Sequence, residues 1–170
     1  MLDTAELDTT LVGIRTATLM LPFLGAAVAS DILHRRIPNI LVALMLACGL
    51  AVHLASLDDA GSALLASGSG AAVGFLILLP FYALGGMGAG DVKLLAAVGS
   101  FFGPSGALLA GIFTLVAGAL LGLAVIACRY LRASALSRCS IAASPPEIAS
   151  EQLPYSVAIS LGTLAAVMQW

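Results

Sequence analysis

Six apolar segments follow one another along this chain, and they constrain its fold more than any other feature. A helix needs about 20 mostly apolar residues to cross the hydrocarbon core of a bilayer. We place the segments at 11–30, 38–57, 62–84, 92–102, 105–131 and 154–170. The fourth is short, and we expect it to extend backwards through Asp91 or to be tilted. Because helices satisfy their own backbone groups in lipid, the sequence predicts an all-α, polytopic membrane bundle of about six transmembrane helices.

The composition supports a single integral-membrane domain over residues 1–170. Hydrophobic residues make up 61% of the 170 positions and charged residues 9%, whereas soluble domains carry roughly 25% charged residues. The formal net charge is −2, and no basic surface is available for nucleic acid. Three acidic residues near the N-terminus replace the positive charge of a signal peptide, so we expect the first segment to remain in the mature protein. They are Asp3, Glu6 and Asp8.

Cysteine and histidine do not form a recognisable metal motif. Cys48, Cys128 and Cys139 are odd in number and lack CxxC spacing, and His34 and His53 lie far apart. Cys48 and Cys128 are therefore interpreted as small apolar side chains, and Cys139 as a free thiol in a polar stretch. We predict neither a metal nor another cofactor.

The few cations predict the topology. With six spans, the cations between or beside them all fall in the first, third and fifth loops: Arg35, Arg36, Lys93, Arg129, Arg132 and Arg138. Cytoplasmic loops carry an excess of Lys and Arg, so this side is predicted to be the cytoplasm. The acidic N-terminus, Asp58-Asp59 and the Gly103-Pro104 turn then lie on the opposite side.

Two aspartates lie at segment ends on this predicted cytoplasmic side. Asp31 ends the first segment and Asp91 opens the fourth. A carboxylate at a membrane span is costly, which makes it a functional-site hypothesis. Two close carboxyls, one ionised and one protonated, could activate a water and supply a proton to a leaving amine. No Ser or Cys nucleophile has a histidine in a recognisable triad context.

Each aspartate also has a simpler interpretation. Asp31 could be an interfacial residue paired with Arg35 at i,i+4, and Asp91 could cap a helix. The glycines before Asp91, at 85, 86, 88 and 90, could serve helix packing or a flexible loop. We interpret Gly88 and Gly90 as a substrate-access loop whose bare backbone an extended peptide can approach. Close helix packing accounts better for Gly68, Gly70, Gly74, Gly111, Gly118 and Gly122.

The motifs resemble those of one known family. Asp31, followed by Arg36-Ile37-Pro38-Asn39 and then by Gly88-Ala89-Gly90-Asp91-Val92-Lys93, is similar to the prepilin peptidase family of GxGD aspartic proteases. Leu153-Pro154-Tyr155 extends the resemblance to the last segment. The resemblance implies a catalytic pair, Asp31 and Asp91, with supporting roles for Arg36, Pro38, Asn39 and Lys93. It also implies a membrane-anchored pilin precursor as substrate, cut on the cytoplasmic side of its hydrophobic helix.

The departures from the family pattern narrow this expectation. Larger members carry an N-terminal region with paired CxxC motifs, linked to N-methylation of the processed pilin, and this sequence has neither. It is similar to the short, peptidase-only members associated with Flp-type (tight-adherence) pili. The resemblance thus implies a multi-pass protein of the bacterial inner membrane that cleaves type IV, Flp-like prepilins. The oligomeric state stays open.

A second hypothesis is a small proton- or cation-coupled transporter that uses Asp31 and Asp91 as ion ligands. Transport sites tend to lie near the bilayer midplane. Both aspartates lie instead at segment ends beside Arg or Lys, which favours a protease open to cytoplasmic water.

Overall fold

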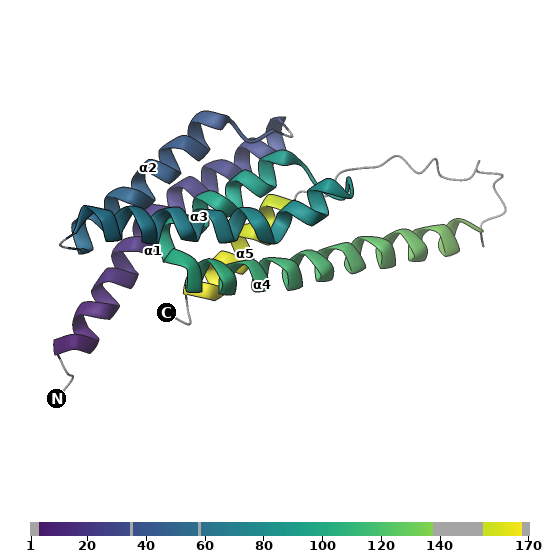
Figure 1. Cartoon of the computed structure of the whole chain (residues 1–170). Coiled ribbons are helices and arrows are strands. Elements are labelled where there is room, and N and C mark those ends of the chain that lie inside the picture. Colours follow the sequence, from purple (N-terminus) through teal and green to yellow (C-terminus); the bar gives the residue numbers. More distant parts are fainter. Residues whose placement is uncertain (1–3, 35, 58, 138–154, 168–170) are drawn as a thin grey trace.

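The computed structural model describes residues 4–34, 36–57, 59–137 and 155–167 (Figure 1). These residues form five helices: α1 (Thr4–His34), α2 (Asn39–Ser56), α3 (Ala60–Ala83), α4 (Ala89–Ser137) and α5 (Tyr155–Val167). No strand occurs in the described ranges, and the predicted all-α class is confirmed. Several residues used in the sequence argument lie outside the described residues: Asp3, Arg35, Asp58, Arg138, Cys139, Leu153 and Pro154.

Helix α4 consists of two helical segments joined at Gly103. Gly103 has φ 70° and ψ −174°, a left-handed φ that favours glycine, and Pro104 follows as the first residue of the next segment. The chain reverses there, so residues 89–102 and 104–137 run back along one another (Figure 1). The tight approach of Gly99 to the Ala107 side chain marks this contact. The turn predicted at Gly103-Pro104 is therefore present.

Three of the described helices are long and apolar enough to cross a membrane. They are Asn39–Ser56, Ala60–Ala83 and the Ala89–Leu131 part of α4, while Thr18–His34 and Tyr155–Val167 form shorter apolar helices. The polytopic membrane arrangement fits this pattern, and the count of six spans stays a prediction. Helix α4 begins at Ala89, so the short fourth segment does extend backwards through Asp91. The C-terminal part of α4 extends past the ends of the other helices (Figure 1).

Local sequence determines where α3 begins and ends. The Asp59 side chain accepts a 2.9 Å hydrogen bond from the Ser62 backbone N–H, which caps the start. At the other end, the Gly86 N–H donates to the Phe81 carbonyl and the Gly85 N–H to the Tyr82 carbonyl, each at 2.9 Å. These are the two bonds of a Schellman motif, and Gly85 adopts the φ of 75° that the motif requires. Gly85 and Gly86 thus terminate α3.

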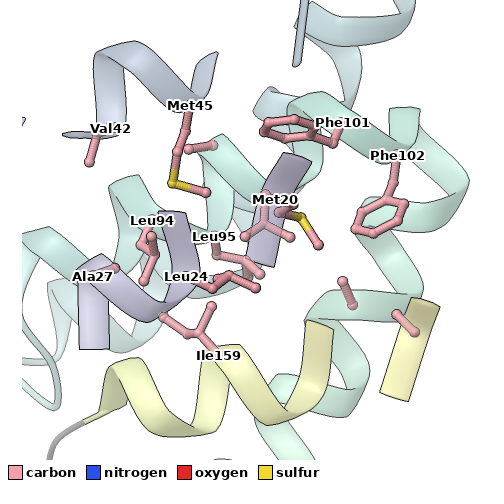
Figure 2. Close-up of a cluster of buried hydrophobic side chains, with 14 of the residues drawn as sticks. Met20, Leu24, Ala27, Val42, Met45, Leu94, Leu95, Phe101, Phe102 and Ile159 are labelled. Atoms are coloured by element: carbon pink, nitrogen blue, oxygen red, sulfur yellow. The ribbon is translucent and has the colours of Figure 1, made fainter. Parts of the chain in front are cut away.

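A shared apolar core connects the helices. Met20 and Leu24 of α1, Met45 of α2, Leu94 and Leu95 of α4 and Ile159 of α5 are buried together (Figure 2). Burying a large aliphatic side chain contributes roughly 1.5–3 kcal/mol where water is the alternative. In lipid the gain is smaller, so close packing matters more.

Glycines allow α3 and α4 to approach closely. A Cβ atom on Gly70 would overlap the Gly99 carbonyl, and one on Gly74 would overlap the Leu95 carbonyl. The packing interpretation also holds for Gly111, which lies against Ile77, and for Gly118, which lies against Tyr155. It is wrong for Gly68 and Gly122 within this chain, because nothing lies within 4 Å of the position that their Cβ atoms would take.

Candidate active site

The helices bring four chain segments together at one end of the bundle, here called the dyad end. It comprises the end of α1 with Asp31, the start of α2 with Asn39, the start of α4 with Asp91 and the start of α5 with Ser156. Two hydrogen bonds connect these segments: the Lys93 Nζ donates to Asn39 Oδ1 at 3.1 Å, and the Ser156 Oγ donates to Asp31 Oδ2 at 2.5 Å. Figure 1 shows these helix ends on the same side of the molecule.

Asp31 lies one turn before the end of α1 and is half-buried. Its Oδ2 accepts the hydrogen bond from Ser156, a residue that is fully buried on α5. The proposed i,i+4 pairing with Arg35 involves a residue outside the described ranges. Asp31 therefore has a hydrogen-bond partner near the other end of the sequence. A purely local role at the end of α1 would not need such a partner.

Asp91 lies in the first turn of α4 and is also half-buried. Its backbone N–H donates to the Gly88 carbonyl at 3.2 Å, and its Oδ2 lies 3.5 Å from the position that a Cβ on Gly88 would take. Asp91 is thus the third residue of α4, and its carboxyl also has a hydrogen bond with the backbone of Gly88, the residue before the helix. The predicted capping role at this helix start is therefore compatible with the structure. The charges of Asp91 and Asp31 are close enough to repel one another.

Two carboxyls in this relation can do specific chemistry. Ionising both brings like charges together, so a close pair can hold a single proton between its members. Such a pair offers a base and an acid within reach of the same substrate bond. The arrangement is therefore suited to hydrolysis by an activated water.

The four predicted supporting residues divide into two groups. Asn39 and Lys93 form the direct link between α2 and α4. Pro38 sits at the N-cap of α2 with φ −62° and ψ 132°, and its carbonyl accepts from the Leu41 N–H at 3.1 Å. Arg36 has an exposed side chain, and its carbonyl accepts from the Ser30 Oγ at 2.9 Å. Pro38 and the Arg36 backbone thus shape the α1–α2 connection beside Asp31.

Gly88 and Gly90 have different surroundings. Gly88 lies in the connection before α4, and Gly90 is already helical. A Cβ on Gly90 would lie 3.4 Å from the Ile37 Cβ, so the bare Gly90 backbone contacts the connection between α1 and α2. Of the glycines in this run, Gly85 is the one with a positive φ. Conformational freedom therefore matters at Gly85, whereas at Gly88 and Gly90 the missing side chain leaves space beside Asp91 and Ile37.

The start of α5 supplies two site residues that the sequence did not identify as such. Tyr155 is half-buried, its ring and hydroxyl lie directly against Gly118 of α4, and it interacts electrostatically with Asp91. Ser156 holds Asp31. The Leu153-Pro154-Tyr155 motif pointed to this helix start. The serine after it had no distinguishing local signal.

The described residues contain no group of three or more His, Cys, Asp or Glu side chains that could hold a metal ion. Cys48 and Cys128 are free thiols, half-buried and exposed respectively. The independence of the reaction from metals stays a prediction.

The described chain is thus an all-helical, apolar bundle with two electrostatically interacting carboxyls, those of Asp31 and Asp91, at one end. Residues 18–123 match the family model described as the type IV leader peptidase family. Because the match covers more than half of the chain, this protein belongs to the type IV leader peptidase family. The matched range includes Asp31 and Asp91 and ends before α5. No curated protein and no solved structure gives a significant match.

Proposed function

We propose that this protein is a membrane aspartic endopeptidase that removes the leader peptide of Flp-like type IV prepilins. One observation carries the proposal. Asp31 and Asp91 lie far apart in the sequence and within the family-matched range, yet both are at the dyad end and their carboxyls interact electrostatically. Membership of a leader peptidase family implies a prepilin as substrate, and the Flp-like kind follows from the resemblance to short, peptidase-only members.

The chemistry needs one ionised and one protonated carboxyl. The ionised aspartate takes a proton from a water as its oxygen attacks the scissile carbonyl carbon, and the protonated aspartate gives its proton to the carbonyl oxygen. A gem-diol forms. In its collapse, one hydroxyl proton returns to the second aspartate, the C–N bond breaks, and the leaving nitrogen takes the proton held by the first. Both carboxyls regain their starting states, and one water is consumed.

The surroundings of the dyad suit a substrate with an apolar helix. Large apolar side chains beside the site are strongly exposed, as expected for surfaces that meet lipid or a membrane helix: Ile32, Leu33, Ile40 and Leu84. The aspartates lie at helix ends, where an extended leader leaving the membrane would pass. A membrane-anchored pilin precursor has this combination of an apolar helix and an adjoining extended segment.

We also propose that the dyad end faces the cytoplasm. Lys93 and the exposed Arg36 lie at this end, and the positive-inside rule assigns such a side to the cytoplasm. The bacterial inner membrane then presents the dyad to a prepilin leader before export of the mature domain.

The test is cleavage by the purified protein. The full chain in detergent or proteoliposomes is mixed with a prepilin that carries a Flp-like leader, and the products are measured by mass spectrometry. A shortened pilin and a free leader are expected from the natural protein, and neither from Asp91→Asn. Cleavage that persists in Asp91→Asn would contradict the dyad. Absence of cleavage together with proton or cation flux in sealed vesicles would favour the transporter hypothesis.

A further inference from the structure

We propose that Ser156 is a positioning residue for the dyad. Its hydroxyl holds one oxygen of Asp31 and leaves the other oxygen for the attacking water. This inference deepens the proposed function and rests on it, because it assigns to α5 a part in the reaction of Asp31 and Asp91.

The contact itself is direct and buried. Ser156 has no exposed surface, and its Oγ donates to Asp31 Oδ2 at 2.5 Å. The two residues are 125 positions apart, so only the packing of α5 brings them together. A hydrogen bond to an ionised acceptor is shorter and stronger than one between neutral groups. The Ser156 hydroxyl therefore has a side-chain acceptor on another helix, the carboxyl of Asp31.

Four other hydroxyls in α4 and α5 donate within their own helix. Those of Ser100, Thr114, Ser160 and Thr163 all donate to a carbonyl three or four residues earlier in their own helix. This is the ordinary way for serine and threonine to satisfy a hydroxyl inside a helix. Ser156 gives its donor to another helix instead. The hydrogen bond to Asp31 therefore explains a serine at position 156 better than any hydrogen bond within α5 does.

Two close contacts fix α5 where Ser156 can reach Asp31. Gly118 of α4 leaves room for Tyr155, since a Cβ there would overlap the tyrosine hydroxyl. Further along α5, Gly162 lies against the Thr114 backbone of α4, again with no room for a Cβ. The two glycines, one on each helix, set the register of α5 on α4. Ser156, the residue after Tyr155, is thereby held within hydrogen-bonding distance of Asp31.

The hydrogen bond from Ser156 to Asp31 is expected to stabilise the transition state more than it strengthens substrate binding. An aspartate side chain can rotate about its terminal bond, and rotation would change which oxygen meets the water. Anchoring Oδ2 restricts that rotation, and reaction rates depend strongly on such alignment. Substrate affinity comes mainly from the rest of the pilin. Loss of the hydroxyl should therefore lower kcat and leave KM nearly unchanged.

The experiment measures prepilin cleavage kinetics for variants of the full-length protein in proteoliposomes. Ser156→Ala is expected to reduce kcat about 10- to 100-fold with KM within about twofold, the size expected for a lost hydrogen bond to a charged group. Ser156→Thr and Ser156→Val form a matched pair of nearly equal volume. Threonine keeps the hydroxyl, so its kcat should exceed that of valine about tenfold or more. Ser160→Ala, the same change one turn later, should stay within about twofold of the natural protein.

The outcomes separate this inference from the proposed function. Equal kcat for Ser156→Thr and Ser156→Val, or a natural kcat for Ser156→Ala, would overturn the positioning role while leaving the dyad intact. A rise in KM with kcat unchanged would likewise overturn it. Normal cleavage by Asp31→Asn would instead overturn the proposed function. Melting temperatures measured on the same preparations show whether each variant is folded. If Ser156→Ala is unfolded, the comparison of kcat between Ser156→Thr and Ser156→Val tests the positioning role.

Discussion

Asp59 and the Asp31–Asp91 pair lie at opposite ends of the bundle and have opposite surroundings. Asp59 is exposed, and its carboxylate accepts two bonds from Ser62, one from the backbone N–H and one from the hydroxyl, each at 2.9 Å. All of its interactions serve its own helix. Asp31 and Asp91 are half-buried, come from different helices, and interact with each other and with α5.

If the Asp31–Asp91 pair is catalytic, as we propose, this difference identifies the property that separates a structural carboxylate from a functional one. All three aspartates lie at helix ends in an apolar chain, and charge alone would rank them equally. A cap satisfies its carboxylate locally, so nothing is gained from another helix. A carboxylate whose partners arrive from distant segments has an environment that tertiary structure builds for it. Such environments are typical of functional sites.

The largest expected difference between the two ends is in cleavage. Asp91→Asn should reduce cleavage about a thousandfold or more, because an amide cannot exchange the proton. Asp59→Asn should cleave at nearly the natural rate, since asparagine caps helices as well as aspartate does. Mass spectrometry of a fixed prepilin substrate measures both. A comparable loss of cleavage in the two variants would show that Asp59 and Asp91 do not differ in function.

Topology gives a second all-or-none comparison. We expect a cysteine introduced at Ser134 to be labelled only from the cytoplasmic side and one at Asp59 only from the opposite side, in a background without the three natural cysteines. Ser134 lies near the end of α4, which runs past the dyad end, and Asp59 lies at the start of α3. A membrane-impermeant maleimide applied to intact or inverted vesicles measures access. Labelling of both positions from one face would contradict the six-span topology.

Valine substitutions at two glycines allow the dyad end and the Asp59 end of the bundle to be compared at equivalent helix positions. Gly90 and Gly61 are each the second residue of a helix, next to Asp91 and near Asp59 respectively. Gly90→Val should lower cleavage strongly, at least about tenfold, because its side chain would crowd Ile37 and the substrate path before Asp91. Gly61→Val would meet mainly the movable Asp59 carboxylate and should leave cleavage nearly unchanged.

Thermal stability measured on the same preparations separates access from packing. A Gly90→Val protein that melts early but cleaves normally at low temperature would leave Gly90 as a packing residue. Ala89→Ser is a mild control, because that exposed position already carries a side chain.

The smallest expected effect is the pH dependence of the Asp59 cap. Hydrogen bonds from the Ser62 backbone and hydroxyl hold the pKa of Asp59 below its usual range. A lowered folded pKa means that the stabilisation is complete above the unfolded pKa and is lost as pH falls through the folded value. Asp59→Ala should therefore slightly lower the melting temperature at neutral pH and leave it unchanged at strongly acidic pH. A pH series of melting curves in detergent measures this, and an equal drop at every pH would contradict it.

Hydropathy predicted most of the fold because a bilayer imposes a length on each apolar segment. The predicted ranges 38–57 and 62–84 nearly coincide with α2 and α3, and the Gly103-Pro104 turn occurs as expected. The first segment was predicted at 11–30, whereas α1 runs from Thr4 to His34. The difference has a physical reason: hydropathy locates the part of a helix in lipid, and a helix continues into water wherever its backbone can remain hydrogen-bonded.

The site was predictable only in part. Asp31 and Asp91 were identifiable because isolated carboxylates are costly in an apolar chain. Ser156 was not, since a serine in an apolar helix is ordinary and its bond to Asp31 depends on how α5 packs. Gly118 and Gly122 show the same limit, because both lie in one small-residue stretch and only Gly118 faces a side chain that needs the space.

The most direct test of the central claim compares the single variants Asp31→Asn and Asp91→Asn with the double variant. If the two carboxyls act as one unit, removing either abolishes proton exchange and removing both adds nothing. The measurement is residual prepilin cleavage at high protein concentration, with folding checked by melting temperature. The account predicts equal residual rates, within about twofold, for all three variants. Losses that multiply in the double variant, or near-normal cleavage by either single variant, would contradict it.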